Sequence, residues 1–183
     1  MGEGLWFANL YATGTRTVRG LEALSTATPP LPGESIVRQA NNSGLYTLGG
    51  MLHKQGFKPM FMYGGYGAFD NMNAYFEGNG YQIRDRNSFS QSNQAFSTIW
   101  GVADELLFNE VIDQLDQDSK VGNKRFIHIM TTSNHRPYTY PEGRIDIPSK
   151  TGRDGAVKYT DWAIGDFIER AKDRPWFADT LFI

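Results

Sequence analysis

Hydroxyl groups and positive charge gather in the segment YATGTRTVRGLEAL, residues 11–24. Thr15 and Thr17 stand directly before a helical pattern of apolar residues. The N-terminus of a helix exposes backbone N–H groups and partial positive charge, and therefore favours phosphate or sulfate. A threonine hydroxyl at that place could act as a nucleophile if a metal ion lowered its pKa. Spacing alone favours a plainer interpretation, in which a threonine caps the helix and the arginines are solvated.

A second polar cluster, TTSNHRPY at residues 131–138, follows a run of strand-forming residues. His135 lies in it beside Arg136, where an imidazole could give a proton to a leaving oxygen or hold a phosphoryl group. A loop histidine bonded to a backbone carbonyl is an equally good interpretation. His128 alternates with apolar neighbours inside the strand itself, which indicates a packed side chain.

The third cluster is YGGYGAFDNMNAYF, residues 63–76. Its glycines would let a substrate approach the backbone, with Asp70, Asn71 and Asn73 as polar contacts. A glycine-rich turn followed by an Asx helix cap explains most of the same pattern.

Predicted strands and helices alternate along the chain, which indicates the α/β class with a mainly parallel sheet flanked by helices. Ligands of such sheets bind beyond the carboxyl ends of the strands. The three polar clusters should therefore lie on one edge of the sheet. The predicted strands are residues 5–12, 58–65, the run that begins at 124, and 179–183, and the predicted helices are 17–25, 46–57, 69–81, 101–117 and 154–173.

The composition excludes several classes of protein. The chain has 183 residues, 14% of them aromatic and 21% charged, which is typical of a folded domain. A net charge of −2 argues against nucleic acid as a partner. The absence of cysteine excludes disulfides, cysteine nucleophiles and cysteine-based zinc sites. No apolar run is long enough to span a membrane, and the first residues lack the pattern of a signal peptide.

Several segments together resemble a known family. YATGTRTVRGLEAL, FMYGGYGAFDNMNAYFEGNGY, IWGVADELLF, MTTSNHRPY and YTDWAIGDFIERAKDRPWFADTLFI occur in the order seen in the lipoteichoic-acid-synthase-like phosphoglycerol transferases. These enzymes form part of the sulfatase branch of the alkaline phosphatase superfamily. The GTRT pattern is most similar to the Gram-negative members. The resemblance covers nearly the whole chain, so residues 1–183 are expected to be part of a single sulfatase-like catalytic domain, truncated at both ends.

The resemblance implies a metal-activated threonine that takes a phosphoglycerol-type headgroup from a lipid donor and passes it to an acceptor hydroxyl. Thr17 matches that nucleophile and metal ligand, and Thr15 is the rival position. His135, with Arg136 beside it, matches the histidine that contacts the headgroup. Asp70 and Asn71 fall in the segment that lines the headgroup pocket. Asp70 and Met72 replace the tryptophan and arginine of the Gram-positive enzymes, and Tyr63 replaces a histidine.

The family's partners would be a phospholipid donor and a glycan or glycerol-type acceptor, on the periplasmic or extracytoplasmic face of the inner membrane. Membrane attachment would use segments absent from this chain. The cofactor would be a divalent ion, manganese, magnesium or zinc. The family's acidic metal ligand lies before residue 1 and its Asp-His pair follows a strand like DTLFI, so Thr17 is the one expected ligand present. One neutral hydroxyl cannot hold a divalent ion, so the 183 residues are expected to be inactive alone.

Two other functions stay open on the sequence. One is a hydrolase of the same fold, either a phosphodiesterase or a sulfatase. Against a sulfatase, neither threonine of GTRTVRG is followed by the x-P-x-R pattern of formylglycine sites, and cysteine is absent. The other is a non-catalytic module that keeps the fold and binds an anion.

Overall fold

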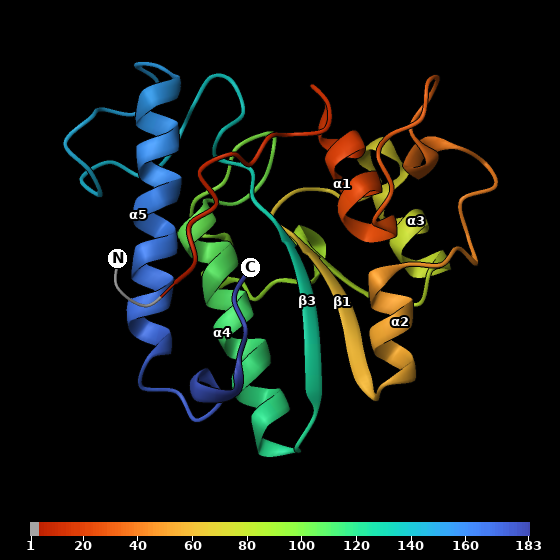
Figure 1. Cartoon of the computed structure of the whole chain (residues 1–183). Coiled ribbons are helices and arrows are strands. Elements are labelled where there is room, and N and C mark those ends of the chain that lie inside the picture. The colour runs from red at the N-terminus through yellow and green to blue at the C-terminus, as the bar shows by residue number, and fades with distance from the viewer. Residues whose placement is uncertain (1–3) are drawn as a thin grey trace.

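The computed structural model describes residues 4–183, which form a three-stranded sheet between two layers of helices (Figure 1). The strands are β1 (Phe57–Tyr63), β2 (Gln82–Asp85) and β3 (Lys124–Met130). The α-helices are α1 (Thr17–Thr26), α2 (Leu48–Lys54), α3 (Met72–Gly78), α4 (Asp104–Lys120) and α5 (Arg153–Ala171). Short 3₁₀ turns occur at Ile36–Arg38, Phe69–Asn71, Arg86–Ser88, Ser92–Gln94 and Phe177–Asp179.

The strands run in the order β2-β1-β3 and all pairs are parallel, which confirms the predicted α/β class. Tyr63, the last residue of β1, is in register with Asp85 at the end of β2 and with Met130 at the end of β3. The carboxyl ends of all three strands are therefore level. Loops that leave these ends are brought together at one edge of the sheet.

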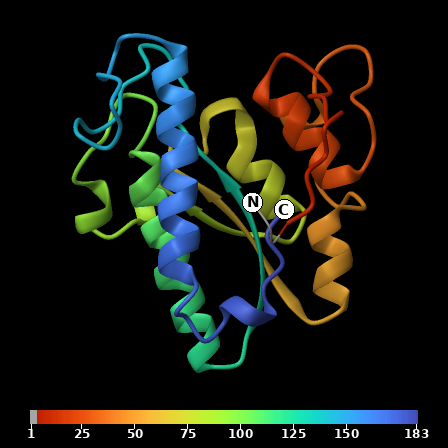
Figure 2. The same cartoon turned by 60° about the vertical axis from the view of Figure 1, so that its left-hand side comes forward.

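Each face of the sheet packs against its own layer of helices, as parallel sheets require (Figure 2). Successive side chains of a strand point to opposite faces. Met60 and Met62 of β1 join the core formed with α4 and α5. Phe61 and Tyr63 join the core formed with α1 and α3, where Phe61 stacks on Phe76 at 3.9 Å between ring centroids.

Two predicted strands are wrong. Residues 5–12 and 179–183 form no strand, and most of their apolar side chains lie in water, with Leu5 and Trp6 90% exposed and Leu181 82% exposed. Phe182 instead packs against the rings of Phe167 and Phe177. An apolar run becomes a strand only where a neighbouring strand supplies backbone hydrogen bonds. The short strand β2 was not predicted, because its residues QIRD are mostly polar.

The predicted helices are confirmed within a few residues of their ends. α1 begins at Thr17, and α4 and α5 begin at Asp104 and Arg153. Among the described helices, none is both long enough and apolar enough to cross a bilayer.

Candidate functional site

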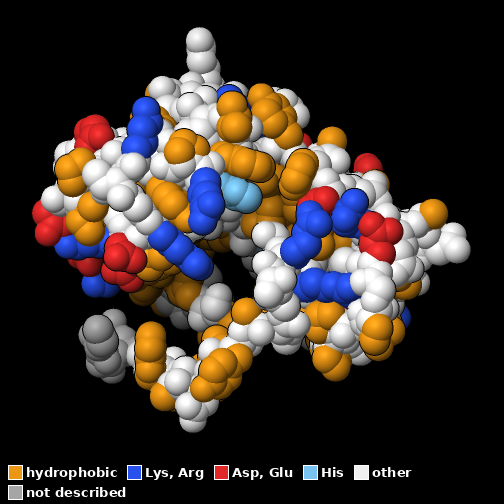
Figure 3. Space-filling model, turned by 90° about the horizontal axis from the view of Figure 1, so that it is seen from above, with side chains coloured by type: hydrophobic (Ala, Val, Ile, Leu, Met, Phe, Trp, Pro, Cys, Tyr) orange, Lys and Arg blue, Asp and Glu red, His pale blue; other side chains and the backbone are white. Residues whose placement is uncertain are grey.

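A cavity of about 610 Å³ opens at the carboxyl edge of the sheet. It lies between the start of α1 and the loops that follow β1 and β3, and Figure 3 looks down onto this end of the molecule. The prediction that the three polar clusters meet at one edge is confirmed. The lining residues are Thr15, Arg16, Thr17, Tyr63, Phe69, Asp70, Met72, Trp100, Met130, Thr131, Thr132, Asn134 and His135.

Thr17 lines the cavity as the first residue of α1. Arg16 occupies the N-cap position, so the capping role considered for the threonines from the sequence is wrong. Within residues 4–183, the hydroxyls of Thr15 and Thr17 have no hydrogen-bond partner, and both side chains are exposed to the cavity or solvent. The backbone N–H groups of a first helical turn also lack intrahelical acceptors. This wall of the cavity therefore offers free hydroxyls and partial positive charge to an anion.

The two arginines of the segment have different roles. Arg19 donates to the backbone carbonyls of Leu31 and Gly33 and forms an ion pair with Glu22. These contacts hold the proline-rich loop against α1. Arg16 instead lines the cavity.

Asp70 lines the cavity with its charge already paired. Its carboxylate lies 3.3 Å from Arg16 and 3.3 Å from Arg38. Asp70 and Asn71 have backbone φ angles of 51° and 62°, in the left-handed region that residues other than glycine rarely adopt. Left-handed backbone at residues other than glycine is concentrated at functional sites. Asn71 does not line the cavity, because its amide nitrogen turns away and donates to the carbonyl of Val37.

His135 belongs to an aromatic wall of the cavity. Its ring stacks on Trp100 at 4.0 Å between centroids, with 15° between the planes, and Phe69 meets the same tryptophan edge-on. The indole nitrogen of Trp100 donates to the carbonyl of Arg136 at 2.6 Å, which fixes the stack. Burial lowers the pKa of His135 below its ordinary 6.5, so the imidazole is neutral at pH 7. A neutral ring offers one N–H donor and one acceptor nitrogen to a ligand.

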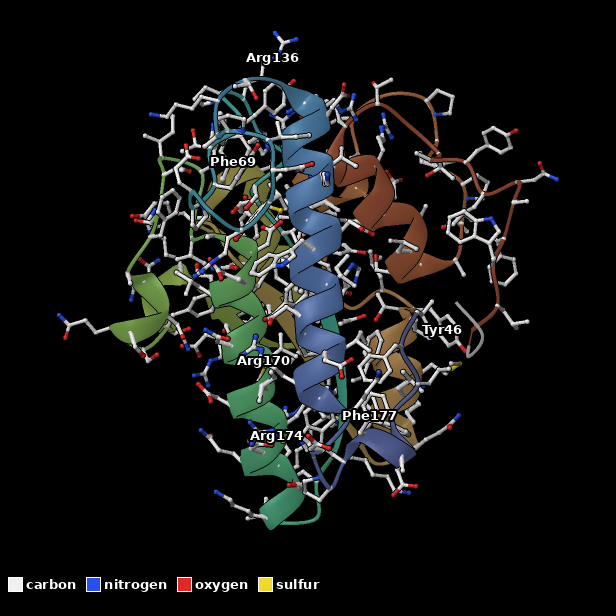
Figure 4. The ribbon with its side chains drawn as sticks, turned by 90° about the vertical axis from the view of Figure 1, so that its left-hand side faces the viewer. Tyr46, Phe69, Arg136, Arg170, Arg174 and Phe177 are labelled. Carbon is white, nitrogen blue, oxygen red and sulfur yellow. The ribbon has the colours of Figure 1, made fainter. Side chains whose placement is uncertain are left out.

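The side chain of Arg136 does not line the cavity. Figure 4 shows it at the end of the molecule, directed into solvent. Its guanidinium donates to the hydroxyl of Tyr138. Sequence reasoning placed it beside His135, and the chain turns it outward instead.

Two buried carboxylates hold the loops of the cavity in place. Asp104, at the start of α4, is fully buried and accepts hydrogen bonds from the backbone N–H groups of Thr132 and Ser133. Asp85 holds the loop that follows β1, because it accepts hydrogen bonds from the N–H of Gly67 and from the side-chain amide of Asn73. The loop conformations are thus set from inside the fold rather than by the loop residues themselves.

Gly65 is required by a close approach. A Cβ atom there would lie 2.4 Å from the carbonyl oxygen of Trp100 and 2.5 Å from the ring of Tyr63. Burial, with a smaller effect from the charge of Asp70, raises the pKa of Tyr63. The Tyr63 hydroxyl therefore stays protonated and can donate a hydrogen bond into the cavity.

Sequence reasoning missed the role of Trp100. Its segment IWGVADELLF was noticed only as a shared motif, and neither its type nor its spacing indicated that it would stack on His135. Asn134 was missed as well, and it lines the cavity while donating to the hydroxyl of Thr160. For Trp100, the one available signal in the sequence was its position beside a glycine at the start of a predicted helix.

The described residues do not make a complete site for a divalent metal ion. Within residues 4–183 there is no group of three or more His, Asp or Glu side chains that could hold one. The single carboxylate of the cavity, Asp70, is held by two arginines. Thr17 could supply one neutral oxygen, which is too few ligands for a divalent ion.

The fold and the site define an α/β protein that has a parallel sheet and an anion-favouring cavity beyond the carboxyl edge of that sheet. Solved structures agree with the fold. A protein of the alkaline phosphatase superfamily from Vibrio parahaemolyticus matches with a TM-score of 0.84 and 41% identity over 93% of this chain. A lipoteichoic acid synthase from Listeria monocytogenes matches with a TM-score of 0.76 and 22% identity over 87% of this chain.

The chain belongs to the sulfatase family, whose model matches residues 1–183. Phosphoglycerol transferase I of Salmonella paratyphi B is 23% identical over 99% of this chain, and the Salmonella typhimurium protein of that name matches equally. The chain spans 26% of the length of these relatives, and 42% and 41% of the two solved chains. The resemblance to phosphoglycerol transferases of the sulfatase branch is thereby confirmed at the level of the family.

Proposed function

We propose that this chain is part of a transferase that moves phosphoglycerol, or a related phospho-headgroup, from a lipid donor to an acceptor hydroxyl. The observation that carries the proposal is the unpartnered hydroxyl of Thr17, at the first position of a helix and on the wall of a large cavity. The relatives named phosphoglycerol transferase I support the choice of headgroup. Residues 1–183 are then part of a single sulfatase-like catalytic domain.

The reaction would take place in two displacements at phosphorus. In the first, the Oγ atom of Thr17 forms a bond to the headgroup phosphorus and loses its proton, while the bond from phosphorus to the diacylglycerol oxygen breaks and that oxygen gains a proton. In the second, the acceptor oxygen forms a bond to phosphorus and loses its proton, while the bond from phosphorus to the Oγ atom of Thr17 breaks and that oxygen regains a proton. A covalent intermediate of this kind splits one difficult step into two easier ones.

The other residues of the cavity would bind rather than react. His135 is neutral at pH 7 because burial lowers its pKa, so it would hold a phosphoryl oxygen through its N–H. Tyr63 would donate a second hydrogen bond from its protonated hydroxyl. Asp70, paired with Arg16 and Arg38, would orient Arg16, the arginine that lines the cavity, toward the headgroup. Arg136 and Asn71, whose side chains lie outside the cavity lining, would not contact the transferred headgroup.

Manganese, magnesium or zinc is the cofactor expected of the family. Because the described residues supply at most the hydroxyl of Thr17, the remaining ligands would have to come from elsewhere. The 183 residues would then be inactive alone. With a lipid donor and a glycan or glycerol-type acceptor, as expected of the family, the reaction would take place on the periplasmic or extracytoplasmic side of the inner membrane.

The test is an intact-mass measurement on the complete protein encoded by the gene, incubated with phosphatidylglycerol and manganese. We expect an added phosphoglycerol group that Thr17→Ala abolishes. Thr15→Ala is the matched control, because it removes the neighbouring hydroxyl from the same wall and should leave the adduct in place. An adduct that survives Thr17→Ala and is lost in Thr15→Ala would move the nucleophile to Thr15.

A second candidate is anion binding without catalysis, favoured by the absence of a complete metal site among the described residues. The same experiment separates the two functions. Reversible binding of glycerol phosphate with no covalent adduct, in the complete protein with manganese present, would support the binding module and overturn the transferase.

A further inference from the structure

Apolar side chains are exposed on the rim of the cavity, outside the residues that bind the headgroup. Ile99 is 81% exposed, Phe69 is 53% exposed and Tyr66 is 45% exposed. Apolar side chains that stay in water contribute no hydrophobic free energy to folding. The three side chains lie on two of the loops that the fold brings to the carboxyl edge of the sheet, the loop after β1 and the loop between β2 and α4.

Specific contacts hold this surface together. Phe69 packs edge-on against Trp100, with 6.4 Å between ring centroids, and Arg86 lies over the ring of Tyr66 at 4.8 Å. Arg86 also donates to the carbonyl of Thr98, beside Ile99. Ile99 is therefore presented at the tip of a tight turn, which the hydrogen bond from the N–H of Thr98 to the carbonyl of Gly101 closes.

The charge of this surface is positive. The loops 11–17, 64–71, 86–100 and 131–138 carry Arg16, Arg86 and Arg136, and their single acidic residue is Asp70, which Arg16 and Arg38 already pair. Figure 4 places Phe69 and Arg136 toward the same end of the molecule. Viewed from above, that end shows hydrophobic side chains next to Lys or Arg side chains around a histidine (Figure 3). The whole chain has a net charge of −2, so the positive charge is local.

Aromatic and aliphatic side chains beside arginines fit the boundary of an anionic lipid bilayer. The rings and the isoleucine can enter the region of the headgroups and upper acyl chains, while the guanidinium groups stay with the phosphates. We infer that the surface formed by Tyr66, Phe69, Ile99 and Arg136, here called the rim surface, docks onto an anionic phospholipid membrane. The mouth of the cavity then faces the lipid headgroups. The choice of phospholipid rests on the proposed function, whereas docking itself needs no catalysis.

The test is flotation of the 183-residue chain with vesicles of phosphatidylcholine, with and without phosphatidylglycerol. We expect binding to the vesicles that contain phosphatidylglycerol, weakened by added salt. Ile99→Ser should lower the partition coefficient by about tenfold. Arg136→Gln should lower it by about fivefold.

Val121→Ser is the matched control, since Val121 is 70% exposed but follows α4 at the opposite end of the sheet. It should bind as the wild type does. Equal losses in Ile99→Ser and Val121→Ser, or no preference for phosphatidylglycerol, would overturn the proposal. Self-association of the wild type that Ile99→Ser abolishes, with no vesicle binding, would instead assign the surface to a second copy of the chain.

Failure of this inference and failure of the proposed function give different results. Thr17→Ala should bind vesicles like the wild type, because its hydroxyl lies within the cavity rather than on the rim surface. Vesicle binding without a Thr17 adduct in the complete protein would leave the docking surface standing and remove the transferase. An adduct without vesicle binding would support the transferase and overturn the docking surface.

Discussion

The buried carboxylates of α4 are fully hydrogen-bonded within residues 4–183, whereas the hydroxyls of Thr15 and Thr17 at the carboxyl edge of the sheet are not. On α4, the fully buried Glu110 accepts hydrogen bonds from Arg84, from the N–H of Ser90 and from the amide of Asn93. Burial alone would raise the pKa of Glu110, but these hydrogen bonds and the charge of Arg84 outweigh it and lower the pKa. At the cavity, the hydroxyls of Thr15 and Thr17 have no such partners within the described residues.

Asp118, near the end of α4, follows the pattern of Glu110. It pairs with Arg125 at 2.6 Å and accepts from Asn123 and Gln114. The cavity instead keeps strained backbone at Asp70 and Asn71. Satisfied buried groups contribute to stability, whereas strained or unpartnered ones are kept where a ligand needs them. Substitutions of the buried carboxylates of α4 (the first region) should therefore change the stability, and substitutions at the cavity (the second region) should change the activity.

The largest effect should come from Glu110→Ala. The hydrogen bonds from Arg84, from the N–H of Ser90 and from Asn93 would be lost, and the guanidinium of Arg84 would lose its carboxylate partner. Breaking a buried pair by removing one partner costs about 4 kcal/mol. For a domain of this size, that loss corresponds to a melting temperature lowered by about 10 °C, measured by thermal unfolding.

Glu77→Ala is the control for this substitution, because Glu77 is exposed on α3. Its melting temperature should stay close to that of the wild type. If Glu110→Ala unfolds at the wild-type temperature, the distinction between the two regions is wrong.

A somewhat smaller effect should appear in acid, through His128. Its ring packs edge-on against Phe61 and Phe76, and burial lowers its pKa from 6.5 to about 4. The unfolded chain binds the proton more tightly than the folded one, so stability falls as the pH drops from 6.5 toward 4. The loss from this one group should approach about 3 kcal/mol.

Denaturant unfolding at a series of pH values would measure this loss. His128→Leu should flatten the curve between pH 6.5 and 4, because the group that titrates there is gone. His53→Gln, which removes an exposed imidazole, should leave the curve as it is in the wild type. A wild-type slope in His128→Leu would show that other groups cause the acid sensitivity.

Much of the fold could be predicted from the spacing of apolar residues, but the pairing of strands could not. Residues 57–63 and 5–12 are both apolar runs of similar length, yet the first forms β1 with neighbours on both sides and the second lies in water. Hydrophobicity indicates that a segment can be buried, and only the neighbouring strands decide whether it is. For the same reason the polar β2 escaped prediction, since its strand depends on pairing with β1.

The candidate site shows the same limit. Thr17 and His135 could be singled out because each follows a loop at a predicted sheet edge. The pairing of Asp70 with Arg16 and Arg38 joins residues 54 and 32 positions apart, and the stack of Trp100 on His135 joins residues 35 apart. Such contacts are set by the tertiary fold, and no local pattern records them.

The smallest effect separates two roles of His135, stacking on Trp100 and binding a ligand. His135→Ala removes both the ring and its nitrogens, whereas His135→Phe keeps a ring for the stack and removes only the nitrogens. Loss of one hydrogen bond to a charged headgroup costs about 2 kcal/mol, or roughly thirtyfold in kcat/KM. We expect both variants of the complete protein to fall by that factor with a phospholipid donor, at unchanged melting temperature. If His135→Phe keeps the wild-type kcat/KM, the ring of His135 only positions Trp100, and the histidine has a structural role like that of the buried carboxylates of α4.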